Sequence, residues 1–341
     1  MPAQLRTVLV LPALMWILLP GNLPSAPGAD RNPEAMRIFA AVFSVQGSVS
    51  GSSAGRFGVF VRQAADTAWS MVTRSNVFTF GLGRFERGST RRLYIAAGNG
   101  LHRSTDDGHS WRIVTSWETM EVLSVVPDPV DSATVYAATP WGVFKTIDDG
   151  LVWVHKEKGF KRWFVRMLIM DPGDRRVLYA AAEDDLYRST DAGESWEPLK
   201  VGASQILTVL LGRRNPEFIA VGVEDGGIRL SEDGGRHWKT AEGIGNSTVY
   251  VIAGSPDGAR LYAGGWQSGL WESDGTGRSW RRLWADPNVE AIFAVCVDPR
   301  DPNHLLVGTD GQGVYESTDR GRSWNRGGLM GGKVKQIEFY P

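Results

Sequence analysis

The chain has 341 residues, 37 basic and 38 acidic side chains, a formal net charge of −1 and one cysteine. This charge balance gives no electrostatic basis for binding nucleic acid or an anionic membrane, and a single cysteine excludes a disulfide within the chain. Cys296 lies in the apolar run AIFAVCVDP, where a small core residue is expected. The five histidines show no metal-ligand spacing, so neither a metal site nor a cofactor is predicted.

The N-terminal segment has the pattern of a secretory signal peptide. Arg6 precedes an apolar run at residues 8–20, and small residues offer cleavage sites near Ala26 or Ala29. The run is interrupted by Pro12 and is short for a bilayer span, although an uncleaved anchor is the alternative. We therefore expect residues 1–29 to be a signal peptide, the mature protein to be secreted to the periplasm or outside the cell, and no membrane span to remain.

A motif that ends in tryptophan repeats along the rest of the chain. It is clearest as RSTDDGHSW, RSTDAGESW and ESTDRGRSW, and weaker as KTIDDGLVW, LSEDGGRHW and ESDGTGRSW. The closing tryptophans are spaced by 42 to 44 residues: Trp111, Trp153, Trp196, Trp238, Trp280 and Trp324. Trp69, 42 residues before Trp111, marks a seventh, degenerate copy. This period, with short strand-like runs between the motifs, is typical of one β-propeller blade per repeat.

The residue types of the motif suit a tight turn between two strands. Serine and aspartate side chains can hydrogen-bond nearby backbone amides, glycine can adopt a positive φ, and tryptophan brings a large apolar surface to the next strand. The motif is therefore predicted to be structural rather than catalytic. The residues expected to build it are Ser104, Asp106, Gly108, Trp111, Asp148, Gly150, Trp153, Ser189, Asp191, Gly193, Trp196, Ser231, Asp233, Gly235, Trp238, Ser273, Gly277, Trp280, Ser317, Asp319, Gly321 and Trp324.

Each repeat is predicted to supply four short strands, A to D, and the two chain ends indicate how the ring closes. Residues 36–43 align with strand B of the other repeats, and residues 334–339 align with strand A. We therefore predict an all-β fold, a single seven-bladed β-propeller over residues 36–341, whose first blade combines residues 36–72 with 333–341. Residues 44–58 form a Gly/Ser-rich insertion, expected to be a flexible surface loop or, alternatively, a partner-binding loop.

The pattern S-x-D-x-G-x-x-W resembles the Asp-box, or bacterial neuraminidase repeat, from about residue 36 to the C-terminus. Propellers with this box include sialidases, xyloglucan-degrading glycosidases, sortilin-type receptors and photosystem II assembly factors. The repeat style is most similar to sortilin-like and xyloglucanase-like propellers. The sialidase arginine-isoleucine-proline motif is not matched, since Phe39 follows Arg37 and Ile38. The xyloglucan enzymes use carboxylates that face each other from two propellers, whereas one propeller is predicted here.

Strand order separates the loops into two faces of the ring. The boxes and the A–B turns share one face, the box face, and the D–A and B–C connections share the other, the D–A face. The D–A face is the better candidate for ligand binding, because it is rich in tryptophan and polar side chains. Its expected ligand-binding residues are Trp117, Trp141, Trp163, Arg166, Trp266, Gln267 and Trp284. The alternative is that these tryptophans pack the bases of loops; Trp271, within strand C, is expected in the core.

Two functions remain open from the sequence. The favoured one is a secreted, monomeric, non-catalytic propeller that binds a polysaccharide or a polypeptide partner on the D–A face. The alternative is a glycoside hydrolase, sialidase-like or xyloglucanase-like, which needs two carboxylates about 5–10 Å apart across the scissile bond. In that case the candidate acids are Glu183, Asp185, Glu224 and Asp310.

Overall fold

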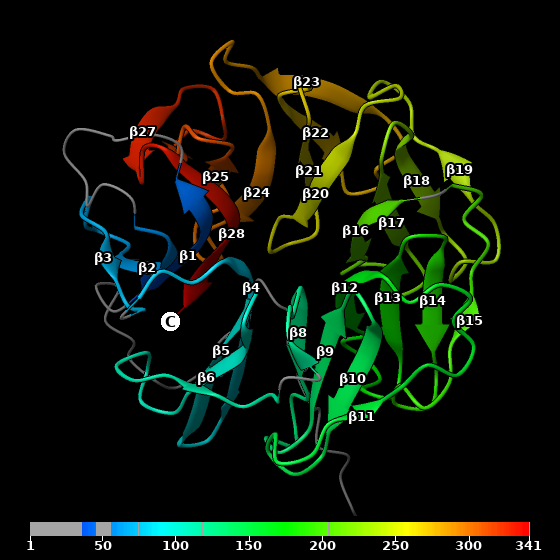
Figure 1. Cartoon of the computed structure of the whole chain (residues 1–341). Coiled ribbons are helices and arrows are strands. Elements are labelled where there is room, and N and C mark those ends of the chain that lie inside the picture. The colour runs from blue at the N-terminus through cyan, green and yellow to red at the C-terminus, as the bar shows by residue number, and fades with distance from the viewer. Residues whose placement is uncertain (1–35, 46–55, 74, 117–118, 204, 341) are drawn as a thin grey trace, which may run out of the picture.

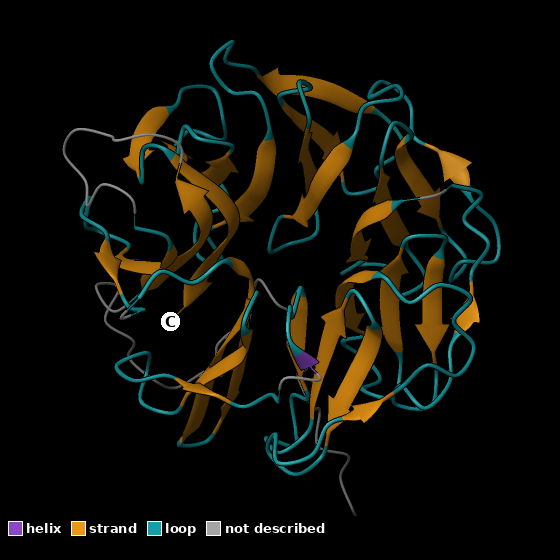
Figure 2. Ribbon diagram, viewed as in Figure 1, coloured by secondary structure: helices purple, strands orange, loops and turns teal. Residues whose placement is uncertain are grey.

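A computed structural model describes residues 36–45, 56–73, 75–116, 119–203 and 205–340. Within these residues the strands form seven antiparallel sheets of four strands each, arranged as the blades of a ring (Figures 1 and 2). The predicted signal peptide at residues 1–29, most of the insertion at 44–58, and Trp117 lie outside the described residues. No helix long and apolar enough to cross a membrane is found in the described part of the chain.

The blades follow one another in chain order, and each runs outward from its innermost strand. Blade 1 consists of β28 (Gly332–Tyr340), β1 (Arg37–Val45), β2 (Gly58–Gln63) and β3 (Ser70–Met71). Blade 2 consists of β4 (Thr79–Arg87), β5 (Thr90–Ala97), β6 (Gly100–Ser104) and β7 (Arg112–Ile113). Blade 3 consists of β8 (Ser124–Pro127), β9 (Val135–Thr139), β10 (Gly142–Thr146) and β11 (Val154–His155). Blade 4 consists of β12 (Val165–Met170), β13 (Leu178–Ala182), β14 (Leu186–Ser189) and β15 (Glu197–Pro198).

Blades 5 to 7 repeat the same order on the other side of the ring. Blade 5 consists of β16 (Ile206–Leu211), β17 (Ile219–Val223), β18 (Gly227–Ser231) and β19 (Lys239–Thr240). Blade 6 consists of β20 (Val249–Gly254), β21 (Arg260–Gly265), β22 (Leu270–Asp274) and β23 (Trp280–Trp284). Blade 7 consists of β24 (Ile292–Val297), β25 (Leu305–Thr309), β26 (Val314–Ser317) and β27 (Asn325–Gly328). The innermost strands surround a central channel (Figure 1).

The ring closes through the C-terminal strand, as the repeat alignment predicted. β28 pairs antiparallel with β1, from Arg37 opposite Tyr340 to Val45 opposite Gly332. The innermost strand of blade 1 is therefore supplied by the end of the chain and the other three strands by its beginning. This arrangement pairs an edge of the first blade that would otherwise be open.

The hydrophobic core lies between neighbouring blades. The second strand of each of blades 3, 4, 5 and 7 is buried at all five positions, because sheets cover both of its faces. In one such cluster Ile169 of blade 4 packs with Val209 and Val221 of blade 5. Cys296 is buried in the cluster that joins blades 7 and 1, consistent with its expected place in the core.

The repeated motif forms the turn that its residue types favour. In the copy at Ser104, the hydroxyl donates to Asp106 Oδ1 (2.7 Å) and accepts from the Gly108 amide (2.8 Å). Asp106 Oδ1 also accepts from the Ser110 amide (2.8 Å), and Gly108 has a φ of 90°. The copies at Ser189, Ser231 and Ser317 repeat these hydrogen bonds. Serine and aspartate are thus occupied in closing the turn.

Several motif tryptophans link their own blade to the preceding one. The Trp153 indole donates to the Val114 carbonyl of blade 2 (2.8 Å), and the Trp238 indole donates to Leu199 of blade 4 (3.1 Å). In the degenerate first copy the Trp69 indole donates to Gly327 of blade 7 (2.7 Å). Even the copy that lacks the serine and glycine therefore keeps the contact between blades.

A buried charged network also joins blade 7 to blade 1. Arg62 on β2 pairs with Glu316 on β26 (2.7 Å), and His304 contacts both Glu316 (2.6 Å) and Asp298 (3.1 Å). Burial alone would lower the pKa of His304, but its hydrogen bonds to Asp298 and Glu316 outweigh burial and raise the pKa to about 9. The imidazolium is therefore the form that the folded ring prefers.

We expect the free energy of unfolding to fall by about 2–3 kcal/mol as the pH rises from 6.5 to 9 because of His304. The folded pKa of about 9 lies above the ordinary value of 6.5, so the stabilisation is complete below pH 6.5 and is lost as the pH approaches 9. Urea unfolding at pH 6 and pH 9 measures the change, and the difference between wild type and His304→Gln isolates this residue. Identical pH profiles for the two proteins would contradict the assignment.

Candidate binding site

A repeated irregularity of the innermost strands shapes the channel at the D–A face. In blades 2, 4, 5, 6 and 7 the second residue of the innermost strand is skipped in the pairing with the next strand. In blade 1 the skipped residue of β28 is Lys335, which lies between Val334 and Gln336. Such β-bulges redirect a side chain out of the regular alternation. Because every innermost strand begins at the D–A face, the bulges lie at that mouth of the channel.

The residues at this position form one ring with one member per blade, which we call the channel ring. Its members, in the order of blades 1 to 7, are Lys335, Phe80, Leu123, Arg166, Leu207, Tyr250 and Phe293. Leu123 lies directly before β8, whose pairing with β9 has no bulge, and its amide donates to the Ala138 carbonyl. All seven line a cavity of about 540 Å³ in the channel. This volume is in the range of small-molecule and side-chain pockets.

One side of the channel ring is an aromatic surface with a lysine on it. The rings of Tyr250 and Phe293 lie 4.8 Å apart, and Lys335 Nζ lies 3.5 Å from the centre of the Phe293 ring. Phe43, also skipped in the pairing of blade 1, lies 5.1 Å from Phe80 and 6.0 Å from Lys335 Nζ. These distances allow cation–π contacts of the lysine with two phenyl rings.

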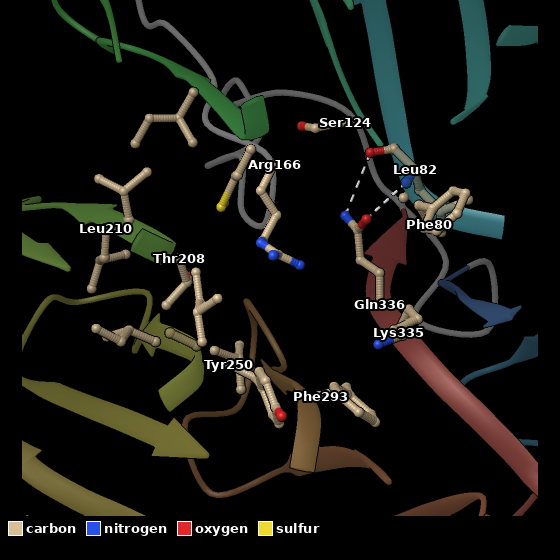
Figure 3. Close-up of a pocket in the computed structure, with 18 of the residues that line it drawn as sticks. Phe80, Leu82, Ser124, Arg166, Thr208, Leu210, Tyr250, Phe293, Lys335 and Gln336 are labelled. Carbon is tan, nitrogen blue, oxygen red and sulfur yellow. Dashed lines mark hydrogen bonds between the residues drawn. The ribbon is translucent and has the colours of Figure 1, made fainter. Parts of the chain in front are cut away.

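Burial and neighbouring charges both affect the cations at this mouth. Burial, together with the positive charges of Lys333 and Arg166, lowers the pKa of Lys335 to about 8, against an opposing effect of Asp310. Burial also lowers the pKa of Arg166, an effect that Glu224 and Glu183 oppose. Figure 3 shows Arg166, Tyr250, Phe293 and Lys335 around the same open space.

The tryptophans predicted to bind ligand fall into separate groups. Trp141, in the turn between β9 and β10, and Trp163, just before β12, are about half exposed, at 49% and 52%. The His155 ring lies 6.2 Å from that of Trp163, and His155 Nε2 borders Gly142, the residue after Trp141. Trp266 is 39% exposed but belongs to blade 6. Trp163 therefore lies next to His155, and the turn that carries Trp141 borders the same histidine.

Other predicted ligand residues are engaged within the fold. The Trp284 ring packs at a tilt against the rings of Tyr315 (4.9 Å) and Trp324 (5.0 Å) at the junction of blades 6 and 7. Gln267 has a positive φ of 48°, and its amide donates to the Glu290 carbonyl (2.7 Å). Trp271 is buried, as expected.

The four candidate acids differ in their surroundings. Asp185 accepts hydrogen bonds from the amides of Lys200 and Val201 (both 3.0 Å), so it orders a loop. Asp310 pairs with Lys333 (3.2 Å), and Glu183 pairs with Arg162 (3.5 Å). Glu224 is exposed in the turn after β17 and acts electrostatically on Arg166 and Tyr250. Within the described residues no group of three or more His, Cys, Asp or Glu side chains could hold a metal ion.

Of the channel ring, only Arg166 was predicted from the sequence as a ligand-binding residue, and it was expected on a loop of the D–A face. A signal was nevertheless present. The ring members follow one another at intervals of 41 to 43 residues, and each lies at or near the start of the innermost strand of its blade. Alignment of the repeats at this position, rather than at the tryptophan, finds all seven.

Comparisons with known proteins place the fold but not the family. No family model matches the chain, and no curated protein matches it significantly. Solved structures do match: the GH74 xyloglucanase from Xanthomonas campestris is 21% identical with a TM-score of 0.59, over 73% of this chain and 45% of that one. The GH74 enzyme of Niastella koreensis is 18% identical with a TM-score of 0.56, over 75% of this chain and 45% of that one.

A third similar structure matches this chain over nearly the whole length of both proteins. YCF48 bound to a D1 peptide is 13% identical with a TM-score of 0.58, and the match covers 92% of this chain and 98% of that chain. By contrast, the chain spans less than half the length of the two GH74 proteins. At these identities the likenesses show the propeller fold alone.

Proposed function

We propose that this protein is a secreted, non-catalytic propeller that binds an extended polypeptide across its D–A face. The observation that carries the proposal is that this face carries two accessible surfaces, the exposed indoles of Trp141 and Trp163 and the channel ring. Trp163 precedes Arg166 by three residues, so about 10 Å of extended chain separates them. A bound chain can therefore contact the indoles and place a side chain in the channel.

A polysaccharide is the second candidate, because Trp141, Trp163 and Trp266 expose indole rings that can pack on sugar rings. The channel ring favours the polypeptide. Five of its seven members are Phe, Leu or Tyr, and four of these have no side-chain hydrogen-bonding group for a sugar hydroxyl. The likeness to YCF48, which was solved with a bound peptide and aligns along nearly its whole length, is consistent with this choice.

A glycoside hydrolase is less well supported by the surroundings of the four acids. Hydrolysis needs one carboxyl group that donates a proton and a second that acts as base or nucleophile. Asp185 is held by backbone amides, while Asp310 and Glu183 are in ion pairs. An ion-paired carboxylate is poorly suited to donate a proton.

The single variants Trp141→Ala and Trp163→Ala should each bind the polypeptide about tenfold more weakly. Each change removes an exposed indole, and a tenfold loss corresponds to ~1.4 kcal/mol of binding free energy. A peptide and glycan array identifies ligands of the mature protein, and calorimetry measures their affinities. Ile147→Ala is the matched control, since Ile147 is 69% exposed on the box face. Wild-type affinity in the double tryptophan variant would exclude this surface as the binding site.

The same preparations decide between binding and hydrolysis. We expect no release of reducing ends from any glycan that the wild-type protein binds. Release that disappears in Glu183→Gln or Glu224→Gln, with binding retained, would instead establish the hydrolase. Secretion is tested by recovering the protein from periplasm or medium and determining its N-terminus by mass spectrometry.

A further inference from the structure

The channel ring carries two cations, and they come from distant blades. Arg166 belongs to blade 4 and Lys335 to blade 1, which are three blades apart in a ring of seven. Both side chains line the same cavity, and Figure 3 shows both beside its open centre. Neither forms an ion pair with any residue that the structure describes. A negative group on the channel axis would therefore have a cation on two sides.

None of the neighbouring carboxylates forms an ion pair with Arg166 or Lys335 among the described residues. Lys333 is on the same strand as Lys335 and is matched by Asp310, its ion-pair partner at 3.2 Å. Glu183 is matched by Arg162 at 3.5 Å. Glu224 on the turn after β17 acts on Arg166 but forms no ion pair with it among the described residues. Glu121 also lines the cavity and is partly exposed.

Like charges kept close together, without carboxylate partners, destabilise a fold. Lys335 lies on the same strand as Lys333 and lines the same cavity as Arg166, and burial together with these two charges lowers its pKa to about 8. Such an arrangement is typical of a site that binds an anion, because the ligand supplies the missing negative charge.

We propose that the channel ring binds a side-chain carboxylate of an acidic peptide segment, held between the Arg166 guanidinium and the Lys335 ammonium. The inference rests on the proposed function and specifies its ligand. The aromatic side of the ring, formed by Phe293, Tyr250 and Phe80, receives the aliphatic part of the same glutamate or a neighbouring apolar residue. An acidic sugar fits less well, because its hydroxyl groups would be buried against phenyl rings.

The test uses calorimetry on the full chain with hexaglutamate and with neutral hexaglutamine as probes. We expect hexaglutamate to bind at least about tenfold more tightly than hexaglutamine at low salt, and less tightly as salt is added. Arg166→Gln and Lys335→Gln should each weaken hexaglutamate binding by about tenfold or more. Arg322→Gln, which removes the same charge from an exposed position on the box face, should change it less than about twofold.

Thermal unfolding of Lys335→Gln distinguishes a binding residue from a structural one. Removing a partly buried charge that is repelled by its neighbours should leave the melting temperature unchanged or raise it. Loss of hexaglutamate binding together with an unchanged or higher melting temperature supports the proposal. A lower melting temperature with the same affinity as wild type overturns it.

The remaining outcomes separate this inference from the proposed function. Equal affinity for hexaglutamate and hexaglutamine overturns the carboxylate site. It leaves the proposed function standing if array peptides still bind through Trp141 and Trp163, whereas absence of binding to any peptide overturns both. Tighter binding of oligogalacturonate than of hexaglutamate overturns the peptide assignment, and equally tight binding of free glutarate shows a small-anion site instead.

Discussion

Deletion of residues 333–341 is expected to abolish the cooperative unfolding transition, or to lower the melting temperature by at least about 10 °C. The deletion removes β28 and leaves β1 as an open edge facing the channel. Val334, Ile337, Phe339 and Tyr340 are buried on this strand, against blade 7 on one side and blade 2 on the other. At about 1.5–3 kcal/mol for each buried side chain, the loss is comparable to the whole stability of a typical domain.

Far-UV circular dichroism during thermal unfolding measures this effect. Lys335→Gln is the control, because it alters the same strand while keeping its backbone pairing and all four buried side chains. A truncated chain that melts at the wild-type temperature would mean that β28 does not close the ring in solution.

Replacement of Glu316 with glutamine is expected to destabilise the fold by about 3–5 kcal/mol. Glu316 is the shared partner of Arg62 (2.7 Å) and His304 (2.6 Å), and the side chain of Arg62 is only 2% exposed. Without the carboxylate, Arg62 remains as a buried charge between blades 1 and 7. The variant should also lose part of the pH dependence between 6.5 and 9, since Glu316 helps to raise the pKa of His304.

Urea unfolding at pH 6 and 9 measures both effects of the Glu316 replacement. Glu232→Gln is a matched control, because Glu232 also has two cationic partners, Arg278 (2.6 Å) and Lys239 (3.8 Å), but at the surface. Exposed pairs contribute about 0–1 kcal/mol, so the control should lose little stability. Equal losses in the two variants would show that the Arg62–Glu316–His304 network is not a special contact of the ring closure.

The candidate site was predictable only in part from the sequence. The choice of the D–A face and of Trp141 and Trp163 came from strand order and composition. Trp284 shows the limit of that reasoning, because its indole was expected on the same face but packs against Tyr315 and Trp324 of blade 7. Composition does not distinguish an indole that packs on a neighbouring blade from one that faces solvent.

The sequence by itself determined the number of blades, the order of their strands and the closure of the ring by the C-terminal strand. The number of blades and the strand order follow from a pattern that recurs every 42 to 44 residues. The closure follows because residues 36–43 align with strand B of the other repeats and residues 334–339 align with strand A. The tertiary structure alone decided which side chains meet in the channel. Arg166 and Lys335 belong to blades that share no strand pairing, and only the bulges in their strands and the curvature of the ring bring both to one cavity.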